Sequence, residues 1–180
     1  MIFTKTALEG AWIIDIKKLE DERGFFARTF CQKEFLEHGL NTRVAQCNIS
    51  YNQKKGTWRG MHLQVSPFQE AKLVQCTAGA IYDVIIDLRP RSRTYLQHLG
   101  VMLNSQEYRM LYIPEGFAHG FLTLTEEVNV FYQMSEFYAP ECARGFRWND
   151  PAFALQLPDE VRVISERDAS YPDFSPDFLR

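Results

Sequence analysis

Residues 71–88, AKLVQCTAGAIYDVIIDL, decide the fold class of this 180-residue chain. Two apolar runs of strand length flank the segment TAGA (residues 77–80), whose glycine suits a tight turn. In the second run the even-numbered positions from 82 to 88 share one face. The odd-numbered positions from 81 to 87, which include Asp83 and Asp87, share the other face. Because this alternation is the period of a β-strand, the stretch predicts two strands joined by a hairpin turn.

Apolar runs of similar length recur along the chain between Gly, Pro and Asn residues. They are AWIIDI (11–16), VAQCNIS (44–50), TWRGMHLQV (57–65), LGVMLN (99–104), MLYIPE (110–115), GFLTLT (120–125) and VNVFYQMS (128–135). Only QKEFLEHG (32–39) has a clear helical pattern, and a second short helix or 3₁₀ turn is expected at DPAFAL (150–155). The predicted fold is therefore one all-β domain over residues 1–180, a jelly-roll sandwich or barrel with a few short helices. Barrels of this kind hold a ligand in the mouth.

Charge and composition limit the classes of partner. The net charge is -3, so no global basic field exists to hold nucleic acid, and an anionic partner needs a local cluster of Arg and Lys. Residues 1–24 contain no apolar stretch long enough for a signal peptide or a membrane span. The four cysteines are scattered without a CxxC motif, which is typical of reduced thiols. We expect a cytoplasmic protein without a membrane or nucleic-acid partner.

His62 stands out in WRGMHLQ (58–64), because an ionisable ring in an apolar strand needs a partner or a function. Lys72 shares the face of its strand with Val74, and a lysine on an inward face is costly unless it meets an anion. His119, in IPEGFAHGF (113–121), could face the same cavity. The alternative is structural: His62 as a core histidine bonded to backbone, and His119 as a cap on the next strand.

The same residues bear on metal binding. In the general cupin pattern His62, position 64, Glu70 and His119 would be the metal ligands. Position 64 is glutamine here, which is a poor ligand for transition metals. The sequence therefore predicts no metal and no cofactor.

Seven segments, in the same order, give the chain a specific resemblance to the dTDP-4-dehydrorhamnose 3,5-epimerase family of deoxysugar epimerases. They are DERGFFARTF (21–30), RGMHLQ (59–64), EAKLVQCTAGAIYDVIIDLR (70–89), YIPEGFAHGF (112–121), VFYQMSEFYAPE (130–141), RGFRWNDPAF (144–153) and ISERD (164–168). The resemblance implies a metal-free cupin jelly roll, usually a homodimer whose N-terminal strands reach into the partner's sheet. It also implies inversion of C3, C5 or both in a nucleotide-linked 4-keto-6-deoxyhexose, as in the synthesis of dTDP-rhamnose for lipopolysaccharide O-antigen.

The resemblance assigns four catalytic positions. His62 matches the general base, and Asp168 matches the carboxylate that orients its ring. Lys72 matches the cation that stabilises the enolate oxygen at C4. Tyr132 matches the acid that returns a proton from the opposite face.

The implied binding residues surround the pyrophosphate, the sugar and the base. They are Arg23, Phe26, Arg28, Gln46, Asn48, Arg59, His119, Tyr138 and Arg167. The chain departs from the family where Cys47, Arg28 and Ala143 replace acidic residues and Arg167 replaces a lysine. Arginine suits a base edge rich in acceptors, so a CDP-linked sugar is an alternative substrate to the dTDP-linked one.

Three other functions are open at this stage. A metal-dependent cupin enzyme such as a dioxygenase would contain bound metal. A non-catalytic sugar-nucleotide-binding cupin would not exchange protons. A keto-isomerase of the same superfamily would not be expected to carry His62, Lys72, Tyr132 and Asp168 together.

Overall fold

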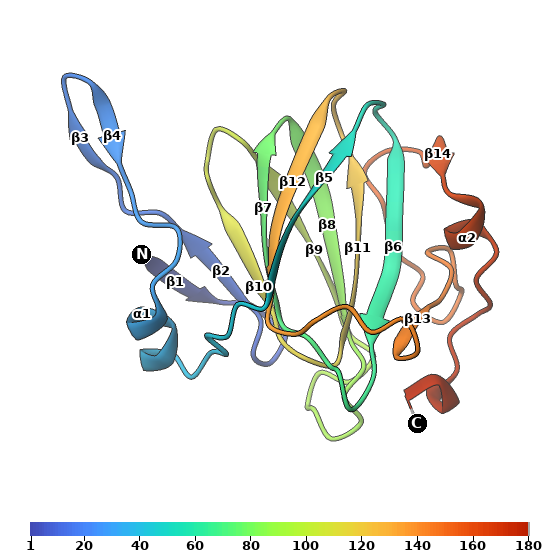
Figure 1. The fold of residues 1–180 in the computed structure, drawn as a ribbon. Coiled ribbons are helices and arrows are strands. Elements are labelled where there is room, and N and C mark those ends of the chain that lie inside the picture. The colour runs from blue at the N-terminus through green and yellow to red at the C-terminus, as the bar shows by residue number, and fades with distance from the viewer. Residues whose placement is uncertain (180) are drawn as a thin grey trace.

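The computed structural model, which describes residues 1–179, is built mainly from two β-sheets that face each other (Figure 1). The first sheet has the strand order β1 (Ile2–Lys5), β2 (Trp12–Asp15), β10 (Met110–Ile113), β7 (Lys72–Ala78), β12 (Val128–Met134) and β5 (Gln46–Asn52). The second has the order β13 (Ala143–Gly145), β6 (Thr57–Gln64), β11 (Phe117–Thr123), β8 (Ala80–Asp87) and β9 (His98–Asn104), with β14 (Val163–Ile164) parallel to β6. This arrangement confirms the all-β jelly roll.

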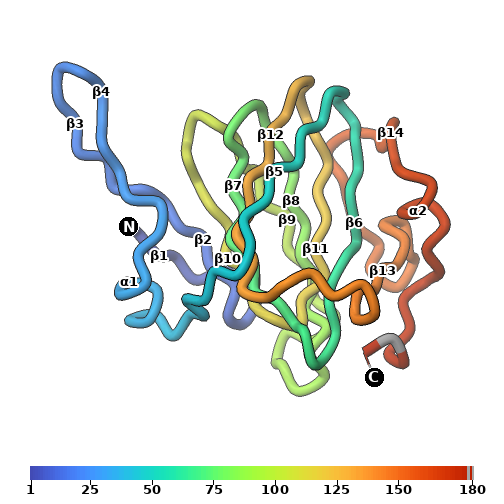
Figure 2. Tube along the Cα trace, viewed as in Figure 1, coloured from blue at the N-terminus to red at the C-terminus, as the bar shows by residue number. Residues whose placement is uncertain are grey.

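The remaining elements lie at the two ends of the sandwich. Strands β3 (Leu19–Asp21) and β4 (Gly24–Phe26) form a separate hairpin that projects away from both sheets, as the chain trace in Figure 2 shows. Residues 1–179 contain three short helices: α1 (Gln32–Glu37), α2 (Glu166–Ala169) and the 3₁₀ helix η1 (Pro176–Leu179). The helix predicted from residue 32 is thus confirmed. The short helix or 3₁₀ turn expected at residues 150–155 is a single turn over residues 151–153, in which the Phe153 N–H donates to the Asp150 carbonyl at 3.1 Å. Within the described residues no helix is long and apolar enough to cross a membrane.

The predicted hairpin at residues 77–80 is wrong. Strand β7 pairs with β10 and β12, while β8 pairs with β9 and β11, so the turn at Gly79 carries the chain from one sheet to the other. The crossing lets Val74 of β7 pack in the same buried cluster as Ile81 and Ile85 of β8. Gly79 has φ +73°, and a Cβ there would lie 2.4 Å from Thr125 Oγ1, so the crossing requires glycine.

The alternation predicted for residues 81–88 is confirmed, and each face of β8 buries against a different core. Ile81 and Ile85 face the other sheet. Val84 and Ile86 pack on the outer side, in a second cluster that includes Phe146 and other residues of the C-terminal third of the chain. Strand β8 is therefore covered on both faces, which explains why its run is nearly all apolar.

A bulge in β6 shapes the site. His119 of β11 is opposite His62, but Phe121 is opposite Arg59, so two steps on β11 span three on β6. Gly60 provides the extra residue, with φ +133°, and a Cβ there would lie 2.4 Å from the Cα of Gly120. Side chains three apart on a regular strand point to opposite faces, so the bulge is what allows Arg59 and His62 to line one cavity.

Candidate active site

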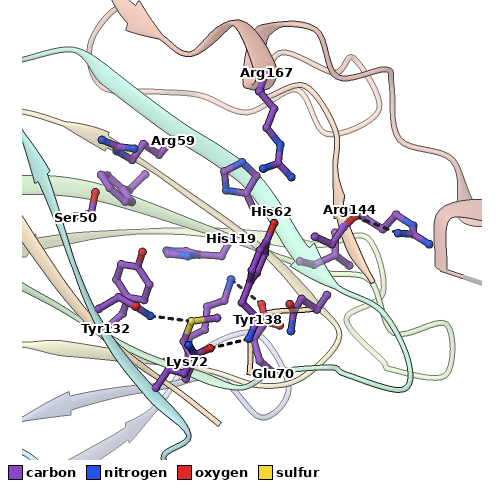
Figure 3. A pocket seen from close by; sticks show the side chains of 17 residues that line it. Ser50, Arg59, His62, Glu70, Lys72, His119, Tyr132, Tyr138, Arg144 and Arg167 are labelled. Atoms are coloured by element: carbon purple, nitrogen blue, oxygen red, sulfur yellow. Dashed lines mark hydrogen bonds and ion pairs between the residues drawn. The ribbon is translucent and has the colours of Figure 1, made fainter. Parts of the chain in front are cut away.

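A cavity of about 490 Å³ opens between the two sheets (Figure 3). One sheet contributes Gln46, Asn48, Ser50, Lys72, Tyr132 and Met134, and the other Arg59, His62, Leu63, Gln64, His119, Phe121, Ala143 and Arg144. Glu70, Tyr138 and Arg167 line it from flanking segments. Its size suits a small organic ligand, and the strands that line it place polar groups on two opposing walls.

His62 and Asp168 form a dyad at this cavity. The Nε2 atom of His62 lies 2.8 Å from Oδ1 of Asp168, although 106 residues separate them in the chain. The histidine side chain is 41% exposed to the cavity and solvent, and the aspartate side chain is 6% exposed. Because Asp168 engages Nε2, the other ring nitrogen, Nδ1, is the atom available to a ligand.

The C-terminal segment holds Asp168 in place. Ser165 caps helix α2, its Oγ accepting a hydrogen bond from the Asp168 N–H at 3.0 Å. The Gly60 N–H donates to Oδ2 at 3.2 Å, so the bulge in β6 also supports the dyad. Burial alone would raise the pKa of Asp168, but the hydrogen bond and charge of His62, the Gly60 N–H and the charge of Arg167 together lower it. Asp168 is therefore an ionised carboxylate, which can stabilise the positive charge that His62 gains when it accepts a proton.

Lys72 and Glu70 form a second buried pair. The Lys72 Nζ lies 3.1 Å from Oε1 of Glu70, and the two side chains are 11% and 4% exposed. They are two residues apart in extended chain, so both point to the same face and into the cavity. An ammonium held in this way is preorganised to meet an oxygen that gains negative charge.

Tyr132 comes from β12, on the wall opposite His62 (Figure 3). Burial raises the pKa of its hydroxyl, and the charge of Arg59 offsets this only in part. Tyr132 is therefore protonated at neutral pH and can act as a proton donor.

His119, on the neighbouring strand β11, is paired with a buried aspartate, as His62 is. It is the cross-strand partner of His62, and its Nε2 lies 2.9 Å from Oδ1 of the fully buried Asp83. This pairing fixes the ring beside the cavity, where the sequence predicts it to lie, and differs from the alternative in which His119 only caps backbone. Asp83 is recognisable in the sequence as an acidic residue in the apolar strand 81–88. The sequence does not show that its partner is His119.

The cavity is locally positive in an acidic protein. Four of its seventeen lining residues are Lys or Arg, and Glu70 is the one acidic residue among them. Arg59 is held by a 2.6 Å hydrogen bond from its Nε to Oδ1 of Asn52. Figure 3 shows Arg59 and Arg167 on one side of His62, and Lys72 with Glu70 on the other. A cavity of this kind attracts an anionic ligand such as a diphosphate.

Tyr138 and Arg167 stand together at the cavity edge. Hydrogen bonding to the side chains of Tyr138 and Tyr171 raises the pKa of Arg167. The Tyr138 N–H donates to Oε1 of Gln46 at 2.6 Å, so a predicted binding residue on β5 positions another. Asn48, also predicted, contacts Met134 Sδ at 3.3 Å through Nδ2.

Three predicted binding residues do not line the cavity of their own chain. Arg23 and Phe26 lie on the projecting β3–β4 hairpin, where Phe26 is 69% exposed and Arg23 pairs with Asp21. Arg28 pairs with Glu34 beside helix α1.

The alternative of a CDP-linked substrate assumes that Cys47, Arg28 and Ala143 lie beside the nucleotide base. Two of them, Cys47 and Arg28, do not line the cavity. Cys47 alternates with Gln46 and Asn48 on β5, so its exposed side chain points to the outer face of the sheet. Arg28 is away from the cavity, and only Ala143 lines it. The Cys47 side chain therefore does not line the cavity of its own chain.

Gln64 is a structural residue. Its Nε2 donates to the carbonyls of Phe68 and Phe137, at 2.8 and 3.1 Å, and its Oε1 accepts the Ala139 N–H at 2.6 Å. Through Phe137 and Ala139, Gln64 fixes the segment that carries Tyr138. Across residues 1–179 no three His, Cys, Asp or Glu side chains gather in a way that could hold a metal ion.

Comparison with known proteins gives one consistent result. The dTDP-4-dehydrorhamnose 3,5-epimerase family model matches residues 5–176. A relative with that activity from Methanothermobacter thermautotrophicus is 43% identical over 172 residues, covering 94% of this chain and 92% of its own length.

Two solved structures have closely similar folds. An epimerase of the same name from Bacillus anthracis, with TDP and pyrophosphate bound, has a TM-score of 0.92 at 36% identity, covering 96% of this chain and 99% of that one. A dTDP-6-deoxy-D-glucose-3,5-epimerase from Legionella pneumophila, in complex with dTDP-4-keto-L-rhamnose, has a TM-score of 0.90 at 35% identity, covering 99% and 96%.

Proposed function

Since the chain belongs to the dTDP-4-dehydrorhamnose 3,5-epimerase family, we infer that it is an isomerase acting on a dTDP-linked 4-keto-6-deoxyhexose in rhamnose biosynthesis. The reaction inverts C3, C5 or both. Each of these carbons is next to the ketone at C4, so the carbanion left by proton removal is delocalised onto the ketone oxygen as an enolate.

One observation carries the assignment of roles: the proposed base and acid stand on opposing sheets. His62 comes from β6 and Tyr132 from β12, with the cavity between them. A sugar ring bound there has one face toward each group. Inversion requires a proton to leave one face and another to arrive on the opposite face, and this placement meets that requirement.

In the proposed step, Nδ1 of His62 takes the proton from C3 or C5. The electron pair of the broken C–H bond forms a double bond to C4, and the carbonyl electrons move to the oxygen. The Tyr132 hydroxyl then gives its proton to the same carbon from the other face, and the ketone reforms. Solvent takes the proton from His62 and returns one to Tyr132. Asp168 stabilises the imidazolium while it exists.

Lys72 is proposed to face the C4 oxygen. Its ammonium is buried and held by Glu70, so it does not have to reorganise when the enolate forms. Arg59 and Arg167 would then bind the diphosphate on the other side of His62, where guanidinium groups can engage two oxygens at once.

A homodimer would complete the site. The family resemblance implies that the N-terminal strands reach a partner, and the β3–β4 hairpin projects with Arg23 and Phe26 exposed. We propose that this hairpin lines the cavity of a second copy. The cytoplasmic location and the place in O-antigen or other polysaccharide synthesis stay predictions.

The proposed function is tested by offering the protein 4-keto-6-deoxyglucose linked to dTDP or to CDP in D2O. We expect deuterium uptake at C3 or C5, with kcat/KM at least tenfold higher for the dTDP sugar, because similar epimerases hold TDP or a dTDP-linked sugar and Cys47 does not line the cavity. A preference for CDP would revive the cytidine alternative. No uptake from either sugar would contradict the function.

A further inference from the structure

Glu70 is held firmly at the cavity wall. It directly precedes β7, and the next residue, Ala71, is fixed on both sides by Ser135: the Ala71 N–H donates to Ser135 Oγ at 2.8 Å, and the Ser135 N–H donates to the Ala71 carbonyl at 2.9 Å. These bonds fix the backbone next to Glu70, while its own side chain is held at the cavity wall by its burial, at 4% exposure, and by the ion pair with Lys72.

One oxygen of Glu70 lacks a partner. Oε1 pairs with Lys72, but Oε2 is buried without a hydrogen-bond partner in the described part of the chain. The side chain is 4% exposed and lines the cavity. A buried carboxylate oxygen left unbonded costs free energy, so a bound ligand that supplies a donor there would gain from it.

The reaction intermediate has a matching pair of groups. This step rests on the proposed function, in which Lys72 faces the oxygen on C4. When C3 loses its proton, C3 and C4 share a double bond, and the C3 hydroxyl lies in one plane beside the C4 oxyanion. We propose that Lys72 and Glu70 bind this enediolate together, with the ammonium donating to the C4 oxygen and Oε2 of Glu70 accepting from the C3 hydroxyl.

The proposed contact distinguishes the two reacting carbons. The enolate toward C5 has the methyl group and the ring oxygen at C5, neither of which can donate to a carboxylate. Glu70 therefore stabilises the C3 enediolate more than the C5 enolate, and it is a specificity-determining residue for inversion at C3. No proton moves to Glu70 in this step: the hydroxyl proton stays on the C3 oxygen, and the proton from C3 goes to His62.

The test compares deuterium uptake at C3 with uptake at C5 by NMR. In Glu70→Ala we expect uptake at C3 to fall about 10- to 100-fold more than uptake at C5, since a hydrogen bond to a charged acceptor is lost. Glu70→Gln keeps the shape and a neutral acceptor, so its selective C3 deficit should be under about tenfold. Lys72→Ala is the control. The C4 oxygen is common to both enolates, so losing the Lys72 ammonium should slow deuterium uptake at C3 and at C5 alike.

An unchanged C3 to C5 ratio in both Glu70 variants would overturn this inference, because it would mean that Glu70 only positions Lys72. The proposed function would survive that result. If the unaltered protein takes up no deuterium at either carbon, the function itself fails, and the inference fails with it. Glu70→Gln keeps the test usable if the alanine variant does not fold.

Discussion

Replacing His62 by asparagine is expected to abolish deuterium uptake at both C3 and C5 of the sugar. His62 is the proposed base for either carbon, and a positioned general base typically contributes about 10²- to 10⁴-fold to the rate. Asparagine keeps much of the shape of the ring but cannot accept a proton. The measurement is the NMR rate of exchange in D2O under saturating substrate.

His98→Asn is the matched control, because His98 is exposed on β9 and does not line the cavity. It should exchange like the unaltered protein. Both variants are checked for a retained fold by circular dichroism and thermal melting. Exchange by the folded His62 variant within about threefold of the unaltered rate would mean that another group is the base, since a general base contributes far more.

Lys72→Ala is expected to have a comparably large effect on all exchange. The enolate forms more slowly at either carbon when the C4 oxygen is not stabilised, and removing one preorganised donor to an oxyanion typically costs about 10²- to 10³-fold in kcat. Tyr132→Phe makes the instructive contrast. It should slow inversion while leaving exchange, because His62 can return a deuteron to the face from which it took the proton.

The contrast can fail in two ways. If Lys72→Ala exchanged deuterium near the rate of the unaltered protein, Lys72 would not be the group that stabilises the enolate. Equal loss of exchange and of inversion in Tyr132→Phe would show that the tyrosine is needed for proton removal, and the two-faced arrangement would then be wrong.

The strands were predictable because their signal is local. Alternation over residues 81–88 gave both the strand and its faces, and the structure confirms which side chains share each core. Strand pairing was not local. A short turn with Gly79 is compatible with a hairpin in one sheet or a crossing between two, and the choice depends on β10, β11 and β12, which come much later in the chain.

The site was predictable in part, and mainly through resemblance. The sequence indicates His62 and Lys72 as candidates because they are polar residues in apolar strands. Their spacing does not indicate that Asp168 or Tyr132 belongs to the same site. The sequence does not predict the bulge at Gly60, because a glycine in a strand can mark a bulge, a bend or a close approach of another backbone. The sequence indicates Glu70 only as a candidate metal ligand, since its pairing with Lys72 depends on how the chain enters β7.

His62 and Tyr132 are proposed to act on opposite faces of the sugar ring. The most direct test of this arrangement is a single turnover of the unaltered protein in D2O, with enzyme in excess over the dTDP-linked 4-keto sugar. Product is quenched early and examined by NMR for configuration and deuterium at each carbon. If His62 removes the proton from one face and Tyr132 supplies another from the opposite face, every inverted carbon should carry deuterium from the solvent. Inverted product that keeps the substrate's own hydrogen would contradict the account, because one group would then have carried the proton between the faces.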